Sequence, residues 1–182
     1  MSSVLSLCVY CGSRPGRNPA YETAARDLGT AIAEKGWRLV YGAGDVGLMG
    51  SVADAARAGG AQTFGVIPTH LVPREAPDGR DTQRIITETM HERKKVMFMN
   101  ADAVAVLPGG AGSLDEFFEV LTWAQLGLHA KPIYLVNIAG YWSPLLRTID
   151  HLIAEGFADQ ALTDLFTAPT SVDELLHALS GN

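Results

Sequence analysis

Near the middle of a chain of 182 residues stands the stretch Ala103-Val104-Ala105-Val106-Leu107-Pro108-Gly109-Gly110-Ala111-Gly112-Ser113-Leu114-Asp115-Glu116. Its apolar beginning predicts a buried parallel strand, and the residues from Ser113 onward predict a helix. The glycines between them let the backbone turn sharply and bring its amides close to a ligand. The first N–H groups of a helix and the positive end of its dipole favour an anion, most often a phosphate. Because Glu116 lies in the first turn of this helix, the stretch indicates chemistry on a phosphorylated molecule.

Strands and helices alternate along the rest of the chain. Strands are predicted over residues 4–11, 37–41, 63–67, 84–87, 103–107 and 132–136, and helices over residues 19–35, 46–57, 90–100, 113–126, 143–155 and 172–179. A charged, proline-rich loop is expected over 68–82, and a short extended piece near 165–167. This alternation predicts an α/β fold: a Rossmann-like doubly wound parallel sheet with helices on both faces, formed by residues 1–182 as a single domain. In such folds ligands bind beyond the carboxyl ends of the strands.

The composition is that of an ordinary globular protein, with 47% hydrophobic residues and a formal net charge of −6. This acidic balance argues against a nucleic-acid partner, because nucleic-acid-binding domains usually carry a basic surface. No apolar run approaches the roughly 20 residues needed to span a bilayer, so no membrane partner is expected. The first residues show no basic segment ahead of an apolar one, so no secretory signal is predicted. A cytoplasmic location is the expectation.

The two cysteines, Cys8 and Cys11, both fall in the first predicted strand. Side chains alternate along a strand, so residues three apart point to opposite faces, and we interpret the pair as buried structural thiols. A thioredoxin-type pair would instead occupy a turn and a helix N-terminus. The five histidines show no metal-ligand spacing such as His-Glu-x-x-His, and no metal site is predicted.

A second glycine turn, residues 42–47, reads Gly-Ala-Gly-Asp-Val-Gly and follows a predicted strand. The G-x-G-x-x-G spacing is compatible with a dinucleotide site. That fingerprint belongs on the first strand, however, and needs an acidic residue near the end of the next one, where this chain has Val66-Ile67-Pro68-Thr69. We therefore favour a turn that lines a mononucleotide or sugar-phosphate site over NAD binding.

Two interpretations apply to Ser113 and Glu116. Their S-x-x-E spacing satisfies the capping box, in which both side chains merely bind free N–H groups of the helix. In the other interpretation Glu116 acts in chemistry, because it aligns with Ser113 on a partly apolar face that begins at the glycine loop. Residues 114, 117, 118 and 121 form the apolar stripe of this helix, and Asp115 and Glu119 share another face that we expect to be solvated.

The basic segment Met90-His91-Glu92-Arg93-Lys94-Lys95-Val96-Met97 also lies on a predicted helix. Basic patches on helices are usually solvated. The spacing of Met90, Arg93 and Met97 nevertheless places the guanidinium on an otherwise apolar stripe. A guanidinium in that position is expected to pair with a carboxylate or a phosphate. A structural ion pair and a functional contact are equally compatible with these residues.

These stretches together resemble the LOG (LONELY GUY) family, whose signature is P-G-G-x-G-T-x-x-E with an upstream M-H-x-R-K. The likeness runs over nearly the whole chain and includes residues 11–13, 41–44, 47–50, 73–75, 122–127, 140–142 and 155–157. Members of this family are phosphoribohydrolases that release the base from nucleoside 5′-monophosphates, notably cytokinin ribotides, and many have been labelled lysine decarboxylases. The resemblance implies a nucleoside monophosphate substrate and no cofactor.

Carried over by position, the resemblance implies that Arg93 and Glu116 are the catalytic pair. The substrate contacts that it implies are Ser13, Glu75, Met90, Lys94, Gly109, Gly110, Ala111, Gly112, Ser113, Leu114, Asp115 and Thr122. It also implies a homodimer with residues of both subunits near each site. The chain departs from the family pattern at Ser113 (usually Thr), Ala43 (often Gly), Thr89 (often Asp) and Arg14 (often Ser). The last two departures put the base preference in question.

In the reaction that the resemblance implies, amides of residues 110–113 hold the 5′-phosphate, and Glu116 stabilises an oxocarbenium-like ribose or positions water. Arg93 is expected either to hold Glu116 ionised and oriented or to bind ribose or phosphate oxygens, and the helix N-terminus also favours the ionised carboxylate. The alternative is a non-catalytic nucleotide- or cofactor-binding carrier, because one fold can serve several functions. A lysine decarboxylase would need pyridoxal phosphate on a lysine, and Lys94 and Lys95 are candidates only by their proximity to the glycine loop.

Overall fold

The computed structural model describes residues 5–75 and 80–180, with all their side chains except those of residues 74 and 75. Within these residues six strands form one sheet: β1 (Ser6–Tyr10), β2 (Arg38–Tyr41), β3 (Gln62–Pro68), β4 (Gln83–Thr87), β5 (Ala103–Val106) and β6 (Ile133–Leu135). Their order across the sheet is β4-β3-β2-β1-β5-β6, and every neighbouring pair is parallel. The parallel sheet predicted from the alternation of elements is thereby confirmed.

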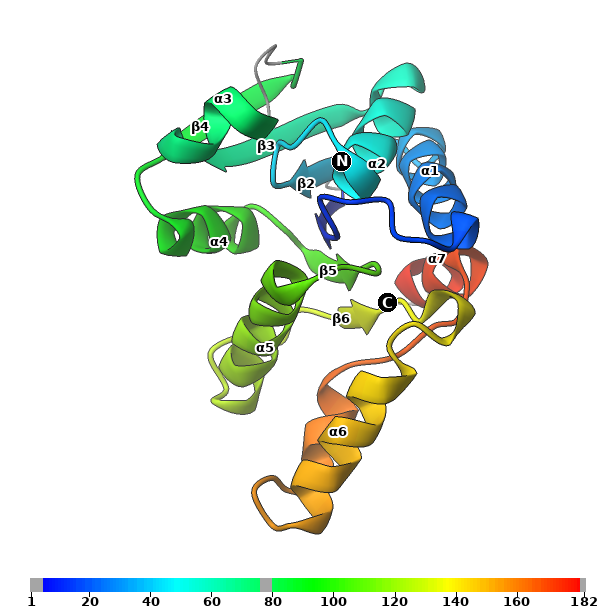
Figure 1. The fold of residues 1–182 in the computed structure, drawn as a ribbon, viewed down its shortest axis with the longest axis vertical. Coiled ribbons are helices and arrows are strands. Elements are labelled where there is room, and N and C mark those ends of the chain that lie inside the picture. Colours follow the sequence, from blue (N-terminus) through cyan, green and yellow to red (C-terminus); the bar gives the residue numbers. More distant parts are fainter. Residues whose placement is uncertain (1–4, 76–79, 181–182) are drawn as a thin grey trace.

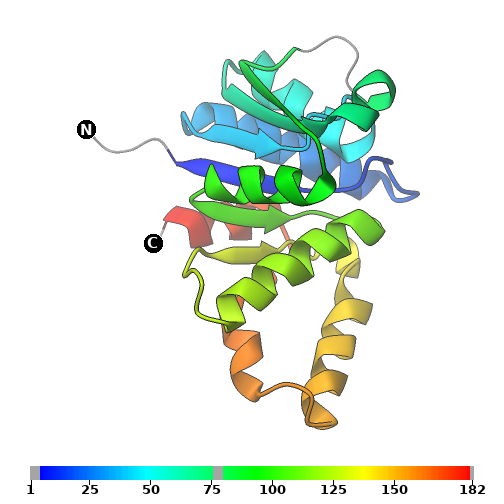
Figure 2. The same ribbon diagram turned by 90° about the vertical axis from the view of Figure 1, so that its left-hand side faces the viewer.

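Helices cover both faces of this sheet, as the doubly wound prediction requires (Figures 1 and 2). The α-helices are α1 (Pro19–Glu34), α2 (Gly47–Ala58), α3 (Val72–Glu75), α4 (Met90–Met99), α5 (Ala111–Gln125), α6 (Ser143–Ala154) and α7 (Val172–Ser180). Side chains of α1, α2 and α7 pack on one face of the sheet, and side chains of α4, α5 and α6 pack on the other. Figure 2 shows α4 and α5 in front of the sheet, with α1 behind it.

The alternation of side chains along β1 divides the hydrophobic core in two. Leu7 and Val9 belong to the cluster with α1, α2 and α7, and Cys8 and Tyr10 belong to the opposite cluster. Cys11 lies one residue beyond the strand in the first cluster, so the two thiols are buried on opposite faces of the sheet. Burial raises the pKa of both thiols far above the usual range. The interpretation of these residues as buried, free cysteines is confirmed.

Three segments differ from the sequence prediction. The expected loop over 68–82 contains a 3₁₀ turn, η1 (Thr69–Leu71), and the short helix α3. The piece near 165–167 follows another 3₁₀ segment, η3 (Gln160–Leu165), and only Thr167 pairs with the sheet, through Tyr134. Finally, α5 begins at Ala111, two residues earlier than predicted, so Ala111 and Gly112 of the glycine loop belong to its first turn.

Local side-chain bonds fix the start of α4, the helix that carries Arg93. Thr89 precedes the helix, and its hydroxyl accepts a hydrogen bond from the Glu92 amide at 3.2 Å, while the Glu92 carboxylate accepts one from the Thr89 amide at 3.1 Å. This reciprocal pair is a capping box. It gives Thr89, one of the departures from the family pattern, a structural role.

The strand order sets the position of the binding crevice. The chain leaves β1 toward β2 on one side, whereas β5 lies against the other side of β1. Such a switch of direction opens a crevice beyond the carboxyl ends of the two strands. The loop after β1 and the glycine loop after β5 therefore face each other. Among the described residues, none of the helices combines the length and the apolar character that a membrane span requires.

Candidate active site

A cleft of about 520 Å³ lies at this crevice. Most of its lining comes from residues 9–16, at the end of β1 and in the loop after it, and from residues 108–113, which follow β5. The remaining walls come from α1, α2, α4, α5, the turn after β2, η1 and the turn before α6. The two loops are tied together, because the Gly12 amide donates a hydrogen bond to the Pro108 carbonyl at 3.0 Å. The cleft therefore occupies the place that the fold reserves for a ligand.

The glycine loop leaves the first turn of α5 without a side-chain cap. Gly110 is the residue before the helix, and neither Ser113 nor Glu116 caps it within the described residues. The capping-box interpretation of Ser113 and Glu116 is therefore wrong, because the earlier start of α5 makes Ser113 its third residue. Gly109 has to lack a side chain, since a Cβ there would collide with the Ser113 hydroxyl. Free amides of Ala111 and Gly112 at the lining suit an anion.

The start of α2 behaves differently from the start of α5. The amides of Leu48 and Met49 both donate to the Gly12 carbonyl, at 3.0 and 3.3 Å. Gly47 has a φ of +62°, and a Cβ at this position would collide with the backbone of Ser13. The first amides of α2 after the G-x-G-x-x-G turn are thus occupied by the loop after β1. This contact disfavours a dinucleotide pyrophosphate at α2 and leaves α5 as the better phosphate site.

Arg93 is buried in the wall of the cleft, with 5% of its surface exposed. Its Nη2 donates to the Gly42 carbonyl at 2.7 Å, and its Nε donates to the Val66 carbonyl at 3.1 Å. The sulfurs of Met90 and Met49 lie 3.9 and 4.0 Å from its Nη1 and Nη2. In the described part of the chain no carboxylate forms an ion pair with it. Its positive charge is therefore positioned by neutral groups and is available to an anion in the cleft.

Glu116 is partly buried and lines the same cleft. Burial raises the pKa of Glu116 from 4.5 to about 7, and the nearby charge of Asp115 adds to this rise, while the charges of Arg93 and Lys94 oppose it. Arg93 favours the ionised carboxylate, as expected, but burial outweighs its effect, so Glu116 is only partly ionised near neutral pH. A carboxyl with this pKa exchanges protons readily at pH 7, as acid–base catalysis requires.

Lys94 is turned away from the cleft and ties α4 to α5. Its Nζ lies 2.9 Å from an oxygen of Asp115 and 3.0 Å from an oxygen of Glu119, and the Lys94 side chain is only 4% exposed. Burial alone would lower the pKa of Lys94, but these two hydrogen bonds outweigh it and raise the pKa. The face of Asp115 and Glu119, expected to be merely solvated, thus holds a buried ammonium. A protonated, doubly paired amine is poorly suited to form a Schiff base.

The other residues implied by the family resemblance divide into two groups. Ser13, Met90 and the loop residues 109–113 line the cleft together with Arg93 and Glu116. Leu114 packs against the core, and Thr122 is exposed on α5 outside the lining. The side chain of Glu75 lies outside the described residues. No group of three or more metal-ligating side chains is found among the described residues.

Sequence reasoning missed two tyrosines of the cleft. Tyr21 on α1 and Tyr141 before α6 both line it, and their rings meet edge to face at 5.2 Å. The only sequence signal for Tyr141 was its place in residues 140–142, one of the stretches that carry the family resemblance. Nothing in that stretch indicated a chemical role for its side chain. Arg14, noted above as a departure from the family pattern, also lines the cleft.

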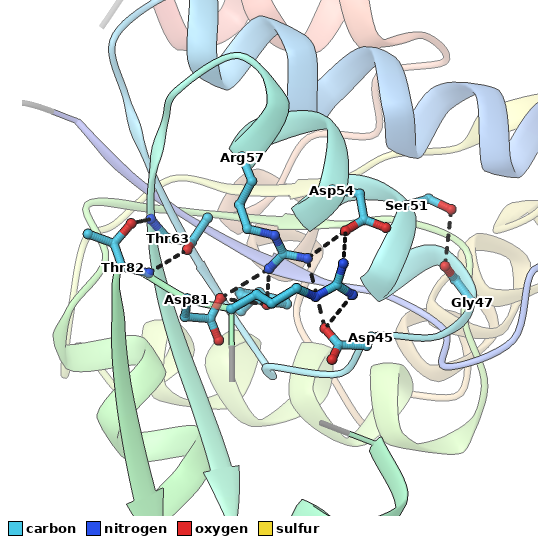
Figure 3. Close-up of polar contacts among 10 residues, drawn as sticks. Asp45, Gly47, Ser51, Asp54, Arg57, Thr63, Asp81 and Thr82 are labelled. Carbon is cyan, nitrogen blue, oxygen red and sulfur yellow. Dashed lines mark hydrogen bonds and ion pairs between the residues drawn. The ribbon is translucent and has the colours of Figure 1, made fainter. Parts of the chain in front are cut away.

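A charged cluster on the outer side of the Gly42–Gly47 turn was also missed (Figure 3). Arg57 of α2 bonds Asp54 at 2.7 Å, the buried Asp81 at 3.3 Å and the Tyr41 hydroxyl at 3.0 Å. It also reaches Asp45, in the turn itself, at 3.8 Å. The cluster ties the turn to α2 and to the chain before β4. It therefore braces the turn whose Gly42 carbonyl positions Arg93.

Comparison with known proteins identifies the relatives of this chain. The family model described as "Possible lysine decarboxylase" matches residues 49–179. The cytokinin riboside 5′-monophosphate phosphoribohydrolase LOG of Oryza sativa subsp. japonica is 46% identical over 171 residues, covering 93% of this chain and 71% of the relative. The cytokinin riboside 5′-monophosphate phosphoribohydrolase LOG7 of Arabidopsis thaliana is 43% identical over 173 residues, covering 95% of this chain and 80% of the relative.

Solved structures show the same fold at lower identity. The molybdenum cofactor carrier protein of Chlamydomonas reinhardtii superimposes with a TM-score of 0.75 at 22% identity, over 98% of both chains. The molybdenum cofactor binding protein of Rippkaea orientalis gives a TM-score of 0.73 at 22% identity, over 100% of this chain and 98% of that one. At this identity the likeness concerns the fold alone. The sequence relatives are much closer, and this chain belongs to the LOG family.

Proposed function

We propose that this chain hydrolyses the N-glycosidic bond of nucleoside 5′-monophosphates, releasing the free base and ribose 5-phosphate. The observation that carries the proposal is the arrangement of three features around one cleft. An uncapped helix N-terminus, a buried guanidinium without a carboxylate partner among the described residues, and a carboxyl with a pKa of about 7 all line it. The close relatives, named as phosphoribohydrolases, support the same reaction.

In this proposal the glycine loop binds the 5′-phosphate. The first amides of α5 and the positive end of its dipole supply donors and charge where the phosphate oxygens lie. Fixing the phosphate fixes the ribose relative to Glu116, five residues beyond the start of the helix at Ala111. The enclosing walls remove much of the surrounding water, which strengthens these interactions.

The chemistry falls to Glu116. The bond between ribose C1′ and the base nitrogen breaks with its electron pair leaving on the base, so positive charge develops on the ribose. The ionised carboxylate of Glu116 stabilises this charge and takes a proton from the water that attacks C1′. That proton then passes to the nitrogen of the departed base, so Glu116 returns to its ionised form. A pKa of about 7 leaves a large fraction of Glu116 ionised at neutral pH while keeping it basic enough to accept that proton. Arg93 binds hydroxyl or phosphate oxygens of the substrate and opposes protonation of Glu116.

A carrier that binds a nucleotide without cleaving it is the main alternative, since the molybdenum cofactor carriers share the fold. Incubation of the pure chain with AMP and with isopentenyladenosine monophosphate separates the two functions. The hydrolase releases base and ribose 5-phosphate in equal amounts, and Glu116→Gln abolishes this release while binding is retained. Binding without release by the native chain identifies a carrier.

We also infer a homodimer and a cytoplasmic location. Large apolar side chains at Met99, Leu126 and Leu128 are 66–69% exposed on or near α4 and α5, which supports a protein partner on that side. The exposed Thr122 lies on α5, four residues before Leu126, and outside the cleft of its own subunit. Light scattering in solution tests the dimer.

A further inference from the structure

Tyr141, in the turn before α6, contacts the glycine loop of the cleft. Its hydroxyl donates a hydrogen bond to the Gly109 carbonyl at 2.5 Å, although the two residues are 32 positions apart in the chain. Its ring packs edge to face on Tyr21 and on Trp142, with centroid distances of 5.2 and 4.7 Å. Both Tyr141 and Gly109 line the cleft. The contact therefore joins the turn before α6 directly to the proposed phosphate loop.

The turn that carries Tyr141 is built in an unusual backbone conformation. Ala139 and Gly140 have consecutive positive φ angles of +50° and +73°. For an alanine this conformation is strained, and it persists only where the surroundings hold it. The buried Asn137 supplies that support: its side-chain oxygen accepts from the Trp142 amide at 2.7 Å, and its own amide donates to the Pro169 carbonyl at 2.7 Å. The phenol is thus held rigidly from its own side.

The carbonyl that Tyr141 holds belongs to the peptide between Gly109 and Gly110. A trans peptide is planar, so fixing its carbonyl oxygen also fixes the Gly110 N–H, which points the opposite way. Glycine on both sides leaves this peptide free to rotate unless something holds it. Ser113 packs closely against Gly109, whereas a Cβ at Gly110 would meet open space, so packing does not restrain the Gly110 side of this peptide. The Tyr141 hydroxyl is the restraint that the described residues provide on this carbonyl.

We propose that Tyr141 is a positioning residue that latches the phosphate loop through the Gly109 carbonyl. The latch pre-orders the Gly110 amide for the 5′-phosphate, so less ordering is needed when the ligand binds. This inference rests on the proposed function, because it takes the glycine loop as the phosphate site. The latch acts on the substrate and the transition state alike, since the phosphate itself does not react. It therefore contributes to binding rather than to the chemical step.

The test compares Tyr141→Phe with Tyr21→Phe. The first variant removes the latching hydroxyl and keeps the ring, and the second removes a hydroxyl that has no hydrogen-bond partner within the described residues. Titration calorimetry with ribose 5-phosphate, which the chain does not consume, measures binding without turnover. Tyr141→Phe is expected to weaken this binding about fivefold, the usual effect of one hydrogen bond, and Tyr21→Phe less than about twofold.

Turnover of AMP supplies a readout that general damage to the fold would not mimic. Loss of the latch raises KM about fivefold and leaves kcat within about twofold, whereas a partly unfolded variant loses kcat at constant KM. Unchanged affinity for ribose 5-phosphate in Tyr141→Phe overturns the latch and leaves the proposed function standing. If the native chain binds ribose 5-phosphate but does not cleave AMP, the hydrolase fails and the calorimetric comparison still decides the latch. If the native chain cleaves AMP but does not bind ribose 5-phosphate, the latch fails and the hydrolase stands.

Discussion

Gly42 and Arg93 fit together so closely that residue 42 has no room for a side chain. The guanidinium donates to the Gly42 carbonyl at 2.7 Å, and a Cβ on Gly42 would collide with Nη2 of Arg93. Arg93 is buried and also donates a hydrogen bond to the Val66 carbonyl, so its side chain cannot move aside without losing that bond. The glycine turn after β2 therefore serves to place a buried cation in the wall of the cleft.

Gly42→Ala is accordingly expected to displace Arg93 and to lower kcat/KM for AMP by about a hundredfold, because small displacements of binding groups have large effects on rate. The control is Ala43→Gly in the same turn. Ala43 has a φ of +56°, which glycine adopts freely, so this variant should fold well and keep its activity. Steady-state kinetics with AMP measure kcat/KM for both variants. Equal kcat/KM values in Gly42→Ala and Ala43→Gly would show that the fit between Gly42 and Arg93 is unimportant.

The pKa of Glu116 predicts the pH dependence of the reaction. Because the ionised carboxylate is the active form in the proposed reaction, kcat/KM is expected to rise with pH, to reach half its maximum near pH 7 and to level off about one unit higher, where Glu116 has lost its proton. The second ionisation of the substrate phosphate lies near pH 6 and has to be separated from this rise. Asp115→Asn separates them, because removing that negative charge lowers the pKa of Glu116 and not that of the phosphate. A rate that falls through pH 7 would instead make Glu116 the acid.

The same pKa predicts a stability effect. Glu116 binds its proton more tightly in the folded chain, with a pKa of about 7, than in the unfolded chain, where the pKa is near 4.5. The free energy of unfolding therefore falls as the pH rises from about 4.5 to 7, and the loss is complete above pH 7. Glu116→Gln should stabilise the protein by roughly 1–3 kcal/mol at pH 8 and by much less at pH 4.5. Urea unfolding at the two pH values tests this, and an equal effect at both would contradict the raised pKa.

Lys94 and Lys95 offer a matched pair of neighbours. Lys94→Met removes the buried ammonium that Asp115 and Glu119 share, and we expect a loss of roughly 1–3 kcal/mol in the free energy of unfolding. Lys95 is exposed, so Lys95→Met should change stability by less than about 0.5 kcal/mol. Chemical denaturation of both variants gives the comparison. Equal stabilities would mean that the bridge between α4 and α5 contributes nothing.

The sequence predicted the strands and most helices because their patterns are local. The apolar run at 103–107 and the glycines after it identify β5 and the loop before α5 without any tertiary information. The start of α5 was misplaced because Ser113 and Glu116 match a capping box by spacing alone. Only the backbone of Gly110 and Ala111 shows that the helix has already begun.

The site was predictable where a motif recorded it and not elsewhere. Arg93 and Glu116 were identified from their positions on helix stripes and from the family signature. The carbonyl partners of Arg93 come from segments 27 and 51 residues away, and no sequence pattern records such contacts. The pKa of Glu116 was misjudged because the nearby positive charges can be read from sequence and the burial cannot. The hydrogen bond between Tyr141 and Gly109 was hidden for the same reason.

The most direct test of the central claim is a chromatographic assay of the pure chain with AMP and with adenosine, run in parallel with Glu116→Gln. The native chain is expected to release adenine and ribose 5-phosphate in equal amounts from AMP and to leave adenosine nearly intact, because the glycine loop needs the phosphate. Glu116→Gln should bind AMP and release nothing. Bound AMP that the native chain never cleaves, or equal cleavage of adenosine and AMP, would contradict the account.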